Sequence, residues 1–542
     1  MSQAEREAPL SIAESGRVAS LDLHWHDSEA RRSTQTATSA GSSKSKLGAD
    51  PFPIVGRRRD LVSRASQVSP FRLSGGTLWQ FTTAISSHSS PATADEASAP
   101  AMVTSTPSGN ERIRRAFMRI PQCILAILAR LGTAAVLTLA FPGLSAAQLS
   151  DTAVWPMLHR DLGHTGQSPY LGPLFPTGAP ANTEVPKWNG VAQVKSSPSI
   201  GVDGTIYAAV GWSLCAINPD MSPKWCKRLH GDVSPSSPGI DADGNIWVGD
   251  RGNAMNAVRP DGTSFKCYYK NGTEGDVKTS PAIGPDGTVY FAFTQNYHGF
   301  GVVAALTPDC TLKWDYTIGQ SVSTSSPALR DADCDPPDPP RTCPVIYLGS
   351  VDGVLHAFKD NGTTVKPLWD TKLGSQISAS PVIAPDGSAL YVGSTSGLSA
   401  VDPSTGSPIG TFATNGTFPT LGMVDQTAAL AADGTIYFGS KSAKKKTFYA
   451  LNPDGTLKWS FGPIMAENDN GAFPIVGADG VVYAGIGTSM YAFSPDDGTV
   501  LWTFKTKGSM MSFPAIGRAD GGNAVLYVPS GDSFIYALSS AR

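Results

Sequence analysis

Two polar clusters in the sequence contain residue types that could bind a ligand. The first is a run of oxygen-bearing side chains of the kind that Ca²⁺ prefers, namely Glu467, Asn468, Asp469 and Asn470. The second is a basic cluster that could attract an anion, namely Lys441, Lys444, Lys445 and Lys446. For each cluster a solvated polar loop is the simpler interpretation.

Two further pairs of residues are candidates for ligand binding, and one motif invites a metal-site hypothesis. The candidate pairs are Asp425 with Gln426 and Tyr297 with His298. In the segment WPMLHRDLGHTGQSPYLGP, a metal ion could be bound by His159, Asp161 and His164. This spacing alone is weak support for a metal site, and we favour a tether that packs on the domain surface.

The elements that would position these residues are short strands that form a repeat. The segment Thr427–Phe461 contains four apolar runs, TAALA, TIYFGS, FYALN and TLKWSF. Asp-Gly turns lie between the first and second runs and between the third and fourth. Asp-Gly supplies the positive φ angles of tight hairpins, so the segment predicts a four-stranded antiparallel meander with strand positions A to D.

Eight copies of this repeat follow one another at a spacing of roughly 40–55 residues, which is typical of a β-propeller. Position B carries an aromatic residue in every copy: Tyr207, Trp247, Tyr290, Tyr347, Tyr391, Tyr437, Tyr483 and Tyr527. Position D brings a tryptophan in five copies: Trp225, Trp314, Trp369, Trp459 and Trp502. The second and fifth copies lack it and have Cys267 and Phe412 nearby instead.

The ends of the repeat array complement one another. The eighth copy stops after FIYALSSAR and has no strand D, whereas PKWNG (Pro186–Gly190) matches a strand D without its own strands A to C. Pairing the two removes the exposed sheet edge that an open array would leave. The sequence therefore predicts an all-β fold, an eight-bladed propeller of four-stranded antiparallel blades closed by an N-terminal strand.

The repeat resembles the PQQ-type propeller repeat of the quinoprotein alcohol dehydrogenase-like superfamily, through SSP in strand A, IYFGS in B, YALN in C and the NPDGTLKW turn and strand. For dehydrogenases of this kind the resemblance implies PQQ and Ca²⁺ on the axis and often a disulfide between adjacent cysteines. This chain has no adjacent cysteine pair. Other members bind proteins, and a third class resembles tetrathionate hydrolases.

The region before the repeats predicts an exported protein. Residues 1–117 have a composition typical of a disordered leader or a misassigned start, and 118–147 read as a signal peptide with a basic region, an apolar run and small residues before a cleavage site. An N-terminal extension over 148–185 and the propeller over 186–542 would follow. We expect a periplasmic or secreted bacterial protein without a stable membrane span after cleavage, exported by either the general or the twin-arginine route.

Six cysteines remain after signal removal, which is an even set suited to disulfides outside the cytoplasm. Cys334 and Cys343 flank a proline-rich insertion, and a bridge between them would close a short loop. Cys215 and Cys226 lie on successive strands, which leaves Cys267 and Cys310 as the third pair.

The net charge of −3 argues against nucleic acid as a partner. The B–C and D–A loops share one face of the predicted propeller and vary more than the turns of the other face. We therefore expect a binding scaffold for a protein or small ligand on that loop face. A PQQ- and Ca²⁺-dependent dehydrogenase that oxidises an alcohol or sugar is the alternative. A hydrolase of the tetrathionate hydrolase-like class is a further one, so whether the chain is an enzyme stays open.

Overall fold

The computed structural model describes residues 150–540 apart from 151, 176–177, 179, 181–184, 264, 271–274, 296–298, 333–342, 444, 466–471 and 519–523. These residues belong to a compact unit, Leu131–Arg542. They form β-strands, turns and loops, and no helix capable of crossing a membrane occurs among them. The proposed leader and signal peptide lie outside the described residues.

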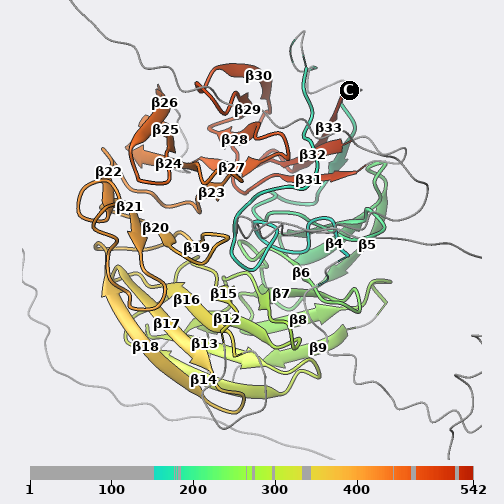
Figure 1. Ribbon diagram of the computed structural model, residues 1–542. Helices are drawn as coiled ribbons and strands as arrows, with labels where there is room; N and C mark the ends of the chain where they lie inside the picture. Colours follow the sequence, from blue (N-terminus) through green and yellow to red (C-terminus); the bar gives the residue numbers. More distant parts are fainter. Residues whose placement is uncertain are drawn as a thin grey trace, which may run out of the picture. The chain divides into compact units, whose positions relative to one another are not determined.

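Eight antiparallel sheets follow one another around a ring, and the first strand of each lies nearest the centre (Figure 1). The first three blades contain β2 (Ser199–Ile200), β3 (Ile206–Val210), β4 (Ser213–Ile217) and β5 (Pro223–Arg228); β6 (Gly239–Ile240), β7 (Ile246–Asp250), β8 (Ala254–Val258) and β9 (Phe265–Lys270); and β11 (Ala282–Ile283), β12 (Val289–Gln295), β13 (Gly301–Leu306) and β14 (Leu312–Ile318). A short extra strand, β10 (Gly275–Asp276), also pairs with β12.

The fourth to sixth blades repeat this order. Their strands are β15 (Ala328–Arg330), β16 (Val345–Gly349), β17 (Val354–Asp360) and β18 (Val365–Lys372); β19 (Val382–Ile383), β20 (Leu390–Ser394), β21 (Gly397–Val401) and β22 (Thr417–Pro419); and β23 (Ala429–Leu430), β24 (Ile436–Ser442), β25 (Lys445–Leu451) and β26 (Leu457–Met465). The described residues of 440–446, expected as an irregular loop, are therefore mostly strand, and Ser442 on β24 pairs with Lys445 on β25.

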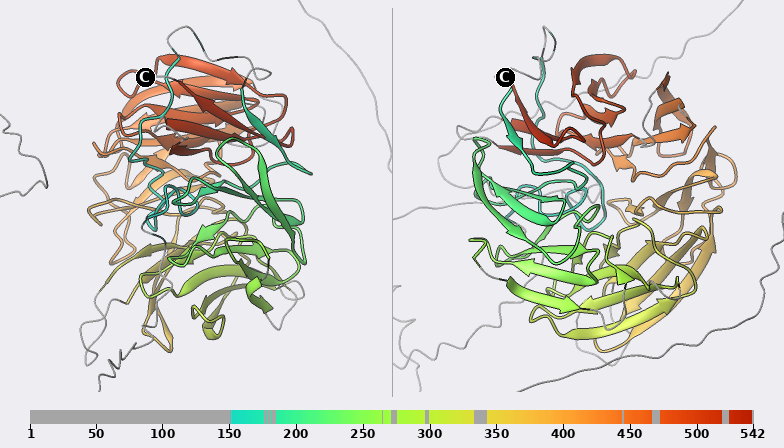
Figure 2. Two further views of the ribbon diagram at one scale, coloured as in Figure 1. Left: turned by 90° about the vertical axis from the view of Figure 1, so that its right-hand side faces the viewer. Right: turned by 180° about the vertical axis from the view of Figure 1, so that it is seen from behind.

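The last two blades complete the ring. The seventh contains β27 (Phe473–Val476), β28 (Val482–Ile486), β29 (Ser489–Phe493) and β30 (Val500–Lys505). The eighth contains β31 (Ala515–Arg518), β32 (Ala524–Pro529), β33 (Phe534–Ser539) and, from the other end of the propeller, β1 (Lys187–Asn189). Trp188 is in register with Ile535, so the predicted closure by the N-terminal strand is confirmed, and β1 runs beside the red strands in Figure 2.

Within a blade, a small residue on the third strand makes room for a large one on the fourth. In the sixth blade Ala450 lies opposite Trp459, and the ring of Trp459 packs at 5.7 Å from that of Tyr437 on the second strand. The Tyr437 side chain is completely buried. Filling the space between neighbouring sheets with such aromatic pairs gives them a large apolar contact.

The five position-D tryptophans also form hydrogen bonds to the next segment around the ring. Trp225, for example, donates from Nε1 to Pro260 O at 2.9 Å, in the outer turn of the second blade. A Cβ on Gly262 of that turn would come within 2.4 Å of the Trp225 ring, so glycine is required there. Equivalent bonds to a proline carbonyl join Trp369 to Pro403, Trp459 to Pro495 and Trp502 to Pro173, whereas Trp314 Nε1 donates to the Asp360 carboxylate.

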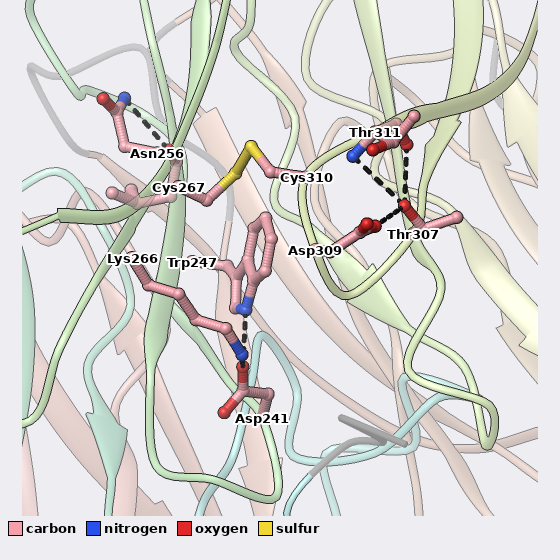
Figure 3. Close-up of a disulfide and its surroundings, with 10 residues drawn as sticks. Asp241, Trp247, Asn256, Lys266, Cys267, Thr307, Asp309, Cys310 and Thr311 are labelled. Carbon is pink, nitrogen blue, oxygen red and sulfur yellow. Dashed lines mark hydrogen bonds and ion pairs between the residues drawn. A yellow bond between two sulfur atoms is a disulfide. The ribbon is translucent and has the colours of Figure 1, made fainter. Parts of the chain in front are cut away.

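The second and fifth blades hold their neighbours differently. In the fifth, Phe412 takes the ring position beside Tyr391, and the backbone N–H of Ala413 donates to Asp454 O. In the second, Cys267 lies opposite Ala257 and forms a disulfide with Cys310 in the third blade's outer turn (Figure 3). A further disulfide joins Cys215 and Cys226, which face one another on β4 and β5. Both pairings agree with the sequence analysis.

The third expected disulfide falls partly outside the described residues. Cys343 is disulfide-bonded, whereas Cys334 belongs to the segment 333–342, which the structure does not describe. The pairing of Cys334 with Cys343 therefore stays a prediction.

The segment 150–168, which we call the strap, runs around the axis and bonds to the inner strands of six blades (Figure 1). Its contacts lie at the ends where the first strands lead into the A–B turns. The acceptors or donors in these strands are Ile200, Ile240, Leu329, Ile383, Leu430 and Val476. The strap therefore closes that end of the central channel.

The strap is interior rather than superficial. Trp155, His159 and His164 are fully buried, and Met157 is 1% exposed. The expectation of a tether on the domain surface was wrong, because the consecutive residues 155–159 are buried and the strap backbone bonds to the ends of the inner strands.

Candidate functional site

A ring of hydroxyl groups surrounds the axis where the first strands begin. In most blades the residue before the strand-A proline accepts a bond from the same residue of the preceding blade. For instance, Ser197 N donates to Ser237 Oγ at 2.9 Å, and Ser237 N donates to Ser280 Oγ at 2.9 Å. The series continues through Ser326, Ser380 and Thr427. Repetition of the Ser-Pro motif thus produces a hydroxyl-lined channel.

In the first four blades the residue before the ring position ties the first strand to the second. The Ser196 hydroxyl donates to Ala209 O and accepts from Ala209 N, both at 2.9 Å. Thr279 makes the same pair of bonds with Ala292, and Gly349 N donates to Ser325 Oγ. These bonds hold the short inner strands in place although each is only a few residues long.

The hydroxyl ring is interrupted in the seventh and eighth blades by Phe473 and Phe513, whose rings contact edge to face at 5.1 Å. The bond from Phe513 N to Ser197 Oγ still joins the eighth blade to the first. The channel therefore has one apolar sector in an otherwise polar wall.

A cavity of about 240 Å³ occupies this part of the channel, and all eight blades contribute to its lining. Its walls are the residues that precede or begin the first strands, on the side of the D–A loops. Leu158 of the strap lies at its inner end. Because the strap crosses the opposite end of the channel, the cavity is a blind pocket.

Three charged side chains line this pocket at one repeat position, two residues before the ring position. They are Lys195 in the first blade, Lys278 in the third and Asp425 in the sixth. The sequence analysis identified Asp425 but missed the two lysines. The available signal was a charge at a position that other copies fill with proline, threonine, serine, glycine or methionine.

Asp425 is 8% exposed, and its Oδ2 lies 2.6 Å from Lys441 Nζ. Its Oδ1 is buried and has no hydrogen-bond partner among the described residues. Gln426, the next residue, also lines the pocket. The structure thus brings together three of the sequence candidates, Asp425, Gln426 and Lys441.

The other candidates do not join this group. Lys445 is exposed and Lys446 is 2% exposed, and neither lines the pocket. The remaining candidates lie outside the described residues: Tyr297, His298, Lys444, Glu467, Asn468, Asp469 and Asn470. Their proposed roles stay predictions.

The two strap histidines are buried neutral side chains. His159 Nδ1 lies 3.0 Å from His164 O, and His164 Nδ1 lies 3.1 Å from Pro381 O. Burial lowers the pKa of His159 to about 3, with a contribution from nearby His164, and burial lowers that of His164 to about 4. In the part of the chain that the structure describes, no three His, Cys, Asp or Glu residues form a possible metal site.

A Ser–His–Asp arrangement occurs on the fourth blade. His356 Nε2 lies 3.0 Å from Ser350 Oγ, and His356 Nδ1 lies 2.7 Å from Asp370 Oδ1. Ser350 is completely buried, and its hydroxyl also contacts Asp352 and Val354 in its own turn. The serine holds this turn and is not accessible to a substrate, so the arrangement is structural.

Comparison with known proteins agrees with this architecture. A family model described as outer membrane protein assembly factor BamB matches residues 394–541. A quinohemoprotein alcohol dehydrogenase from Comamonas testosteroni superposes with a TM-score of 0.53 at 13% identity, over 72% of this chain and 81% of that one. The chain shares the β-propeller fold of that protein. At this level of identity the likeness establishes the fold alone.

Two other solved structures resemble this propeller to a similar degree. Quinohemoprotein alcohol dehydrogenase ADHIIG from Pseudomonas putida HK5 has a TM-score of 0.54 and 13% identity, over 72% of this chain and 81% of that one. A europium-containing methanol dehydrogenase has a TM-score of 0.50 and 13% identity, over 71% of this chain and 90% of that one. The search of curated proteins found no match.

The pocket of this propeller can be compared with what PQQ and Ca²⁺ would require. Ca²⁺ takes six to eight oxygen ligands, usually including several carboxylates. Asp425 is the one carboxylate among the described lining residues, and it is paired with Lys441. The lining aromatic residues, Phe473 and Phe513, contact each other edge to face. The described lining does not match a PQQ–Ca²⁺ pair.

Proposed function

We propose that the protein is an exported binding propeller whose blind axial pocket takes a small polar ligand. The observation that carries this proposal is the lining of the pocket, in which seven of the eight blades contribute hydroxyl groups and three contribute a charged side chain around about 240 Å³. Concave sites with a few converging polar groups are the usual form of small-ligand sites. The pocket lies on the side of the D–A loops, where the sequence analysis expects binding.

Export is supported by the disulfides. Cys215–Cys226 and Cys267–Cys310 are formed in the structure, and such bonds persist mainly outside the cytoplasm. The signal peptide expected over 118–147 gives the same location, periplasmic or secreted. A protein partner is the second candidate, and the match of residues 394–541 to the assembly factor family favours it.

The proposal is tested by a thermal-shift screen of the mature protein against small polar metabolites. Thr324 lines the pocket and is half-buried, so Thr324→Tyr would fill the mouth. Thr456 is exposed in an outer turn on the opposite side, so Thr456→Tyr is the matched control. We expect the screen to yield compounds that raise the Tm of the parent and of the control but not of Thr324→Tyr.

Two results would contradict the proposal. Compounds that stabilise Thr324→Tyr as much as the parent bind outside the pocket. A screen without any stabilising compound, together with a purified protein partner that protects the D–A loops from proteolysis, would favour the protein-binding alternative.

A further inference from the structure

We propose that the axial pocket selects small molecules with an anionic group at one end and a hydrogen-bond donor, an ammonium or hydroxyl group, at the other. This inference rests on the proposed ligand-binding function and specifies the ligand class. It follows from the placement of Lys195, Lys278 and Asp425 around the pocket.

The three charged residues occupy one repeat position but different sectors of the ring. Lys195 belongs to the first blade and Lys278 to the third, so the two lysines flank the second blade. Asp425 belongs to the sixth blade, which lies across an eight-membered ring from the second (Figure 1). The pocket therefore has a cationic wall opposite an acidic one.

The cationic wall has positive charge that its own residues do not neutralise. Lys278 Nζ lies 3.2 Å from Asp276 Oδ2, but the same carboxylate oxygen also takes Arg251 Nε at 3.0 Å. Lys195 forms no ion pair or hydrogen bond within the part of the chain that the structure describes. A carboxylate or similar anion entering the pocket would compensate this charge.

The acidic wall offers an acceptor. Asp425 is more than nine-tenths buried, and its Oδ2 is held by Lys441, which also offsets its charge. Its buried Oδ1 has no partner among the described residues. A buried acceptor without a donor is unfavourable, so a ligand that supplies an N–H or O–H group there gains binding energy.

The cationic and acidic walls together disfavour ligands that carry only an anionic group or only a hydrogen-bond donor. A plain carboxylate would leave Asp425 Oδ1 unsatisfied, and a plain amine would meet the cationic wall without compensating it. Specificity of this kind arises because the wrong ligand leaves buried polar groups unpaired.

The test uses a homologous series of ω-amino acids, with the fatty acid and the alkylamine of each chain length as matched probes. Binding is measured by titration calorimetry on the mature protein, because this method gives the affinity of each defined probe even when that affinity is weak. We expect the best ω-amino acid to bind about tenfold more tightly than either matched probe. The optimal chain length would report the distance between the two walls.

Variants separate the contributions of the walls. Asp425→Asn removes the charge of the acceptor and should abolish the advantage of the amino acid over the fatty acid. Lys195→Met should reduce the advantage over the alkylamine, and Lys195→Met with Lys278→Met should abolish it. Lys224→Met is the matched control, because Lys224 pairs with Asp203 on the opposite side of the propeller. If Asp425→Asn fails to fold, the lysine variants still test the inference.

The outcomes distinguish this inference from the proposed function. If matched fatty acids or alkylamines bind as tightly as the amino acids, or if the lysine variants leave all affinities unchanged, the inference is overturned. It is also overturned if the thermal-shift screen yields pocket ligands that lack an anionic group or a donor, and the proposed function then stands. If no small molecule occupies the pocket, both are wrong.

Discussion

The Cys267–Cys310 disulfide joins the second and third blades at the position where, between the first and second blades, Trp225 packs against Gly262. Cys267 has the register of the tryptophan, opposite Ala257, and Cys310 has the place of the glycine in the outer turn, with a φ of 73°. A covalent bond therefore replaces the aromatic contact between the second and third blades. The pair also explains why a residue other than glycine adopts a positive φ in this turn.

We expect the disulfide to stabilise the joint between these blades. Replacing both residues by serine, Cys267→Ser with Cys310→Ser, removes the bridge without restoring a packing contact. The expected loss is about 2–4 kcal/mol, because the bond closes a loop between residues 43 apart in sequence. Thermal unfolding monitored by circular dichroism would measure it.

The matched control restores the contact found elsewhere in the ring. In Cys267→Trp with Cys310→Gly the indole can cover the turn as Trp225 does, so much of the lost stability should return. A serine pair as stable as the parent, or a Trp–Gly pair less stable than the serine pair, would show that the bridge does not replace this contact.

Acid should destabilise the strap. The pKa values of His159 and His164 are about 3 and about 4 in the folded protein, below the ordinary value of 6.5. Between pH 6.5 and pH 4 the unfolded chain binds more protons, so their contribution to stability is complete above pH 6.5 and falls as the pH falls. The loss for His164 alone is about 3 kcal/mol at pH 4. The pH dependence of the Tm measures it.

Asparagine offers a control for this pH effect, since its amide can replace the Nδ1–H bond to a carbonyl. His164→Asn should lower the Tm at pH 7 but flatten its decline toward pH 4. A variant with the parent's acid slope would mean that other groups dominate the response.

Removing residues 151–190 should open the eighth blade. The deletion takes away β1 and most of the strap, which exposes the edge of β33 and the inner end of the channel. Exposed sheet edges pair with other chains, so we expect aggregation or a large fall in Tm, measured by light scattering and calorimetry. A truncated protein that stays monomeric with the parent's Tm would contradict closure by β1.

Asp360 is the polar centre of the joint between the third and fourth blades. It is 1% exposed and accepts bonds from Tyr290 Oη at 2.6 Å, Lys313 Nζ at 2.8 Å and Trp314 Nε1 at 3.0 Å. Asp360→Ala would leave these donors buried without their acceptor. We expect a loss of about 3–5 kcal/mol in chemical denaturation.

Asp309 provides the comparison for Asp360, because it lies in an exposed turn and bonds only locally to Thr307. Asp309→Ala should cost less than about 1 kcal/mol. Equal effects of the two substitutions would mean that Asp360 holds no special position in the joint.

The last prediction concerns Cys334 and Cys343. Peptide mapping without reduction should recover a cross-linked peptide that contains both residues, because a bridge there closes the proline-rich insertion. Recovery of Cys334 as a free thiol would refute the pairing.

The sequence predicted the propeller because each repeat carries its own local signals. Asp-Gly turns and the strand-B aromatic residues recur at fixed places, so strand order and blade number follow from counting. The orphan PKWNG also predicted the closure. The position of the strap could not be predicted in this way, because its residues bond one at a time to six different blades and show no periodicity of their own.

The site was harder to predict. Asp425 could be identified because it lies where strand A of the sixth copy loses its Ser-Pro motif. Lys195 and Lys278 look like ordinary surface residues in the sequence, and only the ring places them across a pocket from Asp425. The segment 440–446 was assigned to a loop because it is rich in lysine and has no apolar alternation. Strands β24 and β25 nevertheless extend into it.

Closure by β1 has a consequence for how the molecule is made. Trp188 leaves the ribosome long before Ile535, its partner in the eighth blade. The ring can therefore be completed only after nearly the whole chain has been synthesised and, if it is exported, translocated. Contacts of such long sequence separation form slowly, and the edge strands stay open to aggregation meanwhile. Strand β1, which is synthesised before the other strands of all the blades, is thus among the last to pair in its sheet.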